Sequence, residues 1–161
     1  MRCRIALLIL LIPAAPAMAQ VQSLGVFREW GAFVRQNPKN CYAITKPQRG
    51  SRAQDKTAFA SVSYWPKRNI RGQVHFRLSR KKRAGSAVLL KIDDRTFQLL
   101  AGGADAWAPD AQGDALIAAA MRGGVQMSVQ TRAENGAVLR DSYRLRGAAT
   151  AIDAAAIACA R

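Results

Sequence analysis

The segment QVHFRLS, residues 73–79, alternates polar and apolar side chains without a break. Its apolar members Val74, Phe76 and Leu78 fall on one face of an extended chain, and the polar residues fall on the other. This period of two predicts a β-strand with one buried and one solvated face. We therefore expect a fold built from half-buried strands.

Similar segments lie on both sides of this strand. Strands are expected at 26–34 (VFREWGAFV), 41–45, 57–65, 87–92, 96–100, 125–132 and 138–146. The last two flank Glu134-Asn135-Gly136, a strong hairpin signal because Asn-Gly suits the left-handed backbone of a tight turn. Residues 48–56 and 102–110 read as loops, the second of which carries Trp107.

Two segments have helical periodicity. Ala111–Arg122 places Leu116, Ile117, Ala120 and Met121 on one stripe and ends at Gly123-Gly124. Thr150–Ala160 is alanine-rich, and its apolar stripe includes Ile152, Ala156 and Cys159. About eight short strands and two short helices predict a single, mostly β domain, for which a sandwich or a small barrel is the natural arrangement.

The N-terminus has the pattern of a secretory leader. Residues 1–19 read MRCRIALLILLIPAAPAMA, with Arg2 and Arg4 before an apolar run of eight residues and small residues at 17–19. That run is too short to cross a bilayer as a helix. We expect cleavage after Ala19, which leaves residues 20–161 as one exported domain in the periplasm or at the outer membrane.

Cleavage changes the cysteine count. It removes Cys3 and leaves Cys41 and Cys159. An even pair in an oxidising compartment favours a disulfide, with a reactive thiol as the alternative. No CxxC motif is present, and the chain has one histidine, so neither a catalytic cysteine nor a multi-histidine metal site is expected.

The charge is large and unevenly placed. The full chain carries 25 Lys and Arg against 10 Asp and Glu, a net charge of +15. Removal of Arg2 and Arg4 with the leader leaves +13, all of it in residues 20–83, which hold 15 basic and 2 acidic residues, whereas residues 84–161 hold eight of each. Such a surface predicts attraction to anions.

Four pieces of the chain resemble the invasion-associated locus B family. They are Trp30–Pro47 (WGAFVRQNPKNCYAITKP), Ala106-Trp107-Ala108 with the following helix to Gly124, Asp141–Gly147 (DSYRLRG), and the alanine-rich tail with Cys159. The resemblance implies an immunoglobulin-like β-sandwich in the periplasm or cell envelope. It also implies a non-enzymatic role, with a link to host-cell entry in the founding member, and supplies no catalytic residues.

A candidate anion-binding patch lies where the resemblance is weakest. It comprises Lys67, Arg68, Arg71, Arg77, Arg80, Lys81, Lys82 and Arg83. In an exported protein it would hold anionic envelope lipids or polysaccharides by salt-sensitive attraction. The alternative is a solvated loop that protects strand edges. Nucleic acid, the usual partner of so basic a chain, is not expected after export.

The remaining candidate residues have simpler interpretations. Asp93 and Asp94 are expected at a hairpin tip, and Asp105, Asp110 and Asp114 are read as loop acids or acids at a helix N-terminus. The tryptophans Trp30 and Trp107 are expected in the core or against a helix, and His75 on the solvated face of its strand. The sequence thus predicts an exported envelope-binding protein without enzyme activity, cofactor or metal, with a partner in the envelope or at the host interface. An electrostatic binder acting through residues 77–83 and, less favoured, an envelope hydrolase are the alternatives.

Overall fold

The computed structural model describes residues 21–48 and 57–160. The expected leader, its cleavage site and most of the loop expected at 48–56 lie outside the described residues. No helix in the described ranges is long and apolar enough to cross a membrane.

Within the described residues, ten antiparallel strands form one continuous sheet in the order β1-β2-β3-β4-β5-β8-β7-β6-β9-β10. The strands are β1 Val21–Phe27, β2 Trp30–Gln36, β3 Lys39–Thr45, β4 Phe59–Trp65, β5 Ile70–Arg77, β6 Val88–Ile92, β7 Arg95–Gly102, β8 Asp105–Trp107, β9 Gln126–Arg132 and β10 Val138–Arg144. A 3-10 turn, η1 (Pro66–Arg68), joins β4 to β5. The helices are α1 (Ala111–Gly123) and α2 (Ala148–Ala160).

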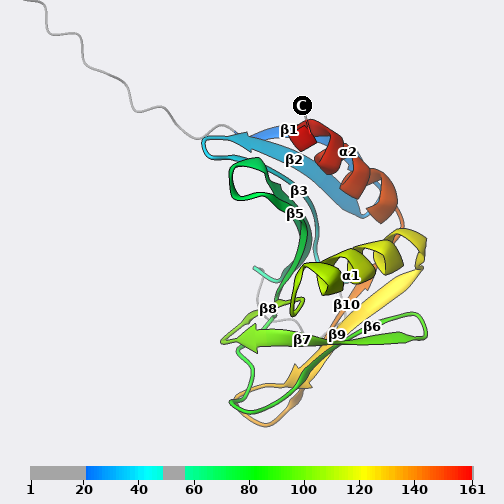
Figure 1. Ribbon diagram of the computed structural model, residues 1–161. Helices are drawn as coiled ribbons and strands as arrows, with labels where there is room; N and C mark the ends of the chain where they lie inside the picture. Colours follow the sequence, from blue (N-terminus) through cyan, green and yellow to red (C-terminus); the bar gives the residue numbers. More distant parts are fainter. Residues whose placement is uncertain (1–20, 49–56, 161) are drawn as a thin grey trace, which may run out of the picture.

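The sheet folds over so that its two halves face each other across one core (Figure 1). Hydrogen bonds tie its last strand back to its early strands: Trp30 Nε1 donates to the Arg144 carbonyl at 2.9 Å, and the Gln48 amide donates to the Ser142 carbonyl at 2.8 Å. The outcome is a sandwich-like fold of mostly antiparallel strands with two helices, one of them C-terminal. This confirms the predicted fold class.

The core collects the alternate residues of nearly every strand, as the period of two requires. Val74, Phe76 and Leu78 are all fully buried, so the segment quoted first does place its apolar face inside. Other large side chains with almost no exposure are Trp30, Val62, Leu90, Ile92, Ile117, Met121, Tyr143 and Ile152.

The two helices pack on the sheet, α2 against the early strands and α1 against β5. Figure 1 shows α2 lying across β1–β3, where Ala151, Ile152 and Ala155 are buried, and α1 packs against β5 and α2. The disulfide between Cys41 and Cys159 is formed and ties the end of α2 to β3 across 118 residues of sequence. The predicted disulfide is therefore confirmed.

Three local predictions are wrong. Residues 26–34 form parts of two strands because the chain turns at Arg28, which adopts a positive φ of 58° without a glycine to signal it. The expected loop at 102–110 contains β8, the short strand that joins the two halves of the sheet. Leu116, placed on the buried stripe, is 47% exposed because α1 turns Ile117 and Met121 inward.

Candidate binding surfaces

The structure separates the eight predicted cations into two groups at opposite ends of β5. Lys67, Arg68 and Arg71 lie on η1 and the first residues of the strand, and Arg77 ends it. Eight extended residues place these ends roughly 25 Å apart. The remaining cations, 80–83, follow Arg77 at the far end. The predicted patch is therefore two surfaces.

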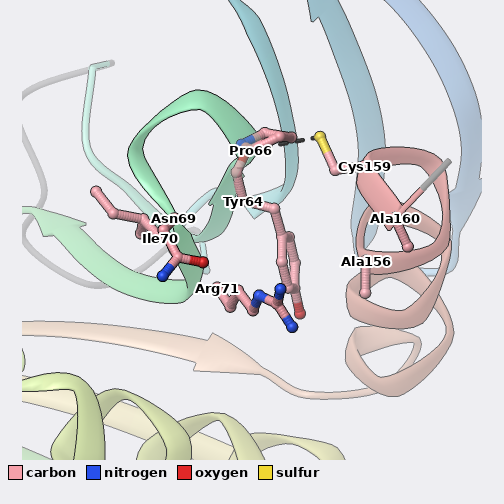
Figure 2. Close-up of a pocket in the computed structure, with 8 residues that line it drawn as sticks. All are labelled: Tyr64, Pro66, Asn69, Ile70, Arg71, Ala156, Cys159 and Ala160. Atoms are coloured by element: carbon pink, nitrogen blue, oxygen red, sulfur yellow. Dashed lines mark hydrogen bonds between the residues drawn. The ribbon is translucent and has the colours of Figure 1, made fainter.

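The first surface borders a cavity of about 450 Å³ between η1 and the end of α2 (Figure 2). Arg71 and Asn69 line one side, Ala156 and Cys159 line the other, and Tyr64 stands between them. Burial raises the pKa of the Tyr64 phenol, an effect that the nearby Arg122 guanidinium opposes. The cavity thus offers a guanidinium and an amide beside the disulfide, donors that suit an anion.

Beside this cavity, Arg68 lies over the Trp65 ring, with its guanidinium carbon 5.5 Å from the ring centroid. Stacking of this kind holds a cation in place while leaving its edge available to solvent. Lys67 and Arg68 are both exposed. This end of β5 therefore presents a cluster of three cations, two from η1 and one from the start of the strand.

The second surface is more constrained. Arg77 is ion-paired with Asp105 on β8. The segment after β5 is anchored by backbone hydrogen bonds: the amides of Leu78 and Lys82 donate to the carbonyls of Ala104 and Gly103 at 2.7 and 2.8 Å. The amide of Arg83 donates to the Arg132 carbonyl at 2.8 Å. The backbone of residues 80–83 is thus hydrogen-bonded to neighbouring segments, while the side chains of Lys81 and Arg83 are exposed.

The lone histidine belongs to a packed cluster on the outer face of the sheet. His75 Nε2 lies 3.0 Å from Asp105 Oδ1, and the His75 ring stacks on Trp107 with centroids 5.2 Å apart. The Phe59 ring packs edge-on against the His75 ring, with their centroids 5.2 Å apart. His75 is on the predicted face of its strand, but its ring is packed against Trp107 and Phe59 instead of being solvated. Trp107 is 36% exposed on this outer face instead of lying in the core. Trp30 is buried as predicted.

Four of the candidate acidic residues have structural partners, and the fifth, Asp94, is exposed at the turn between β6 and β7. Asp110 caps α1 by accepting from the Gly113 amide at 2.7 Å, and Asp93 accepts from the Val125 and Gln126 amides. Asp114 accepts from the Val74 amide at 2.7 Å, so it ties α1 to β5. No three metal-ligating side chains gather within the ranges 21–48 and 57–160.

A third surface was not anticipated: an apolar hollow, here called the end groove, where β1, β2 and β3 meet the end of β10. It has a volume of about 510 Å³. Its apolar lining comprises Val26, Trp30, Gly31, Phe33, Ile44, Pro47, Ala58 and Phe59, and its polar lining comprises Glu29, Thr45, Lys46, Gln48, Thr57 and Arg144.

Two cations from distant parts of the sequence line the end groove, and two more line a hollow that adjoins it. Lys46 and Arg144 line the groove, and Arg28 and Arg146 line the adjoining hollow, which shares Val26 with the groove. Glu29 is the acidic residue of this lining. Sequence reasoning missed the group because two of the four lie in the electrically neutral half, and only the folding-over of the sheet brings them to Lys46.

Comparison with known proteins bears on the fold. Neither the protein-family models nor the curated proteins give a match. Among solved structures, the crystal structure of invasion associated protein B from Bartonella henselae is similar, with a TM-score of 0.58 and 14% sequence identity. The similarity covers 87% of this chain and 99% of that chain. At this identity the likeness shows that the two chains share a fold.

Proposed function

We propose that this chain is an exported envelope protein of the invasion-associated locus B family, and that it acts by binding rather than by catalysis. Three independent features support the proposal. The N-terminal 19 residues have the pattern of a secretory leader, the described fold is that of invasion associated protein B, and the chain closes a disulfide. The fold similarity is the observation that carries the proposal, because it spans nearly the whole of that protein.

The arrangement of side chains favours binding over catalysis. The one histidine has its Nε2 beside Asp105 and its ring against Trp107 and Phe59, so its contacts are those of a packed structural residue. The surfaces that stand out are instead cationic or apolar. These are the groups that hold a ligand by charge and by burial of hydrocarbon.

Electrostatic binding of an anionic envelope polymer or lipid is the second candidate. The Lys67–Arg71 cluster favours it, because Arg71 and Asn69 border a cavity and Arg68 is held over Trp65. The run at 80–83 is a weaker candidate site, because its backbone joins strands and Arg77 is paired with Asp105. In either case, binding should fall as salt rises.

Export and maturation form the first test. The full chain is expressed with its own leader in a bacterial host, the periplasm is released by osmotic shock, and the intact mass is measured. We expect a chain that begins at Gln20 with no thiol available for alkylation before reduction. A chain retained in the cytoplasm with Met1 in place, or with alkylated Cys41, would contradict the proposal.

A further inference from the structure

The floor of the end groove owes its shape to a glycine. Val26 on β1, Gly31 on β2 and Ile44 on β3 lie side by side in register on the outer face of the sheet. A Cβ at Gly31 would lie 2.7 Å from the Phe33 ring, so that ring lies directly over the glycine backbone. The ring of Phe33 also stacks on Tyr42 at 5.6 Å, which holds it there.

Two polar side chains that line the groove from the buried side of these strands, Trp30 and Thr45, already have hydrogen-bond partners inside the protein. Trp30 Nε1 donates to the Arg144 carbonyl at 2.9 Å, and Thr45 Oγ1 donates to the Glu29 carbonyl at 2.6 Å. A sugar or a phosphate at the floor would therefore exchange hydration for contact with hydrocarbon, which is unfavourable. An aliphatic chain would instead gain by burial against Val26, Phe33 and Ile44.

The rim of the groove has the opposite character. Lys46 and Arg144 are exposed at its edge, and no ion pair is formed by either of them within the described residues. Arg28 and Arg146 line the adjoining hollow that shares Val26 with the groove, and Glu29 is the one acidic side chain among the described residues of the groove lining. A ligand with a hydrocarbon tail and an anionic head matches both the floor and the rim.

We propose that the end groove binds one acyl chain of an anionic lipid, with the lipid phosphate held by Lys46 and Arg144. This deepens the proposed function and rests on it, because an exported envelope protein meets anionic phospholipid. A polypeptide partner is a less suitable occupant, because the Trp30 and Thr45 side chains that could bond to its backbone are already hydrogen-bonded within the described residues. The groove shares no lining residue with the cavity beside the Lys67–Arg71 cluster, so ligand binding at these two surfaces can be measured independently.

The test is a calorimetric titration of the mature, oxidised chain with three probes at 0.1 M salt. They are palmitoyl lysophosphatidylglycerol kept below its micelle concentration, palmitoyl lysophosphatidylcholine, and glycerol 3-phosphate. We expect one lysophosphatidylglycerol per chain, binding about tenfold weaker for the zwitterionic lipid, and no measurable binding of glycerol 3-phosphate. Equal binding of glycerol 3-phosphate would overturn the acyl-chain assignment, and equal binding of the two lysolipids would overturn the role of the rim.

A matched pair of variants locates the site. Val26→Glu places a carboxylate on the floor of the groove, and Val138→Glu makes the same change at the start of β10. These valines are 73% and 61% exposed, so both variants should fold. Val26→Glu should weaken lysophosphatidylglycerol binding at least about tenfold, and Val138→Glu by less than about twofold.

The double variant Lys46→Gln, Arg144→Gln tests the rim separately, because it removes the two positive charges and leaves the apolar floor unchanged. It should reduce lysophosphatidylglycerol binding to the level of lysophosphatidylcholine. If the mature chain does not bind the lipid, or if both glutamate variants bind alike, the inference is wrong while export and envelope binding stand. If Val26→Glu binds the lipid normally but no longer retains an envelope protein that the natural chain retains in a pull-down, the groove binds a polypeptide and the inference is also wrong.

Discussion

Asp141 carries a carboxyl group inside the protein, where the residue is only 1% exposed. One oxygen accepts from the Ser79 amide at 2.9 Å, and the other has no hydrogen-bond partner among the described residues. Burial raises the pKa of this carboxyl above its ordinary value, although the Ser79 hydrogen bonds and the Arg80 charge oppose the rise. The nearby Tyr143 phenol has a raised pKa for the same main reason.

This raised pKa makes stability depend on pH in a definite direction. The folded state favours protonated Asp141, so its contribution to the unfolding free energy is fully present below pH 3.8 and is lost as pH rises through the raised value. Asp141→Asn keeps an acceptor for the Ser79 amide but does not titrate. In urea denaturation, the unfolding free energy of Asp141→Asn relative to the natural chain should increase between about pH 4 and pH 7.

The control is Asp94→Asn, the same change at an exposed hairpin residue, which separates burial from overall charge. A difference between Asp141→Asn and the natural chain that stays constant, or decreases, as pH rises would contradict this account.

Single residues were predictable from the sequence where one strong preference acts. Trp30 is large and apolar, Asp110 precedes a helical segment, and both have the predicted roles. Trp107 was not predictable because its place depends on a ring from another strand, His75, on which it stacks. Pair contacts of this kind are not encoded in local periodicity.

The start of α2 is fixed by a close approach between two elements. Gly147, just before the helix, has a φ of 91° and lies against the end of β1. A Cβ at this position would lie 1.8 Å from the Phe27 carbonyl oxygen, which is backbone and cannot rotate away. Only glycine therefore lets α2 begin where it can cross the early strands.

Gly147→Ala tests this contact. We expect the unfolding free energy to fall by at least about 2 kcal/mol, from left-handed strain together with displacement of α2 from β1. The matched control is Gly136→Ala, which has a φ of 80° but no atom within 4 Å of the added Cβ. It should cost about 1 kcal/mol. If urea denaturation shows equal decreases in the unfolding free energy of the two variants, the contact with the Phe27 carbonyl does not contribute to the cost.

Elements with a strong local signal were predictable from sequence. The hairpin at Asn135-Gly136, both helices and the alternation at 73–79 all appear where they were expected. The turn at Arg28 and the three-residue strand β8 were not, because an arginine at positive φ and a strand held by two neighbours leave no local pattern. Such features depend on tertiary pairing.

At the scale of the whole molecule, folding over of the sheet decides which charges meet. It gathers Lys46 and Arg144, which the sequence places far apart, whereas the extended length of β5 separates Lys67–Arg71 from Arg77–Arg83, which the sequence places close together. Charge counts predicted that the surface would attract anions. They did not predict the end groove, because its apolar floor and basic rim come from four separate segments.

The measurement that tests the central claim most directly is a pull-down from isolated bacterial envelopes with the mature chain as bait. It is run at about 50 mM and 500 mM salt, a range over which exposed charges become largely screened. Lys67→Gln, Arg68→Gln, Arg71→Gln is compared with the equal charge change Lys91→Gln, Arg95→Gln, Arg140→Gln. The account predicts an envelope component that binds at low salt, binds less at high salt, and is reduced more by the first variant. Absence of any component bound above a bait-free control at both salt concentrations would contradict a binding role.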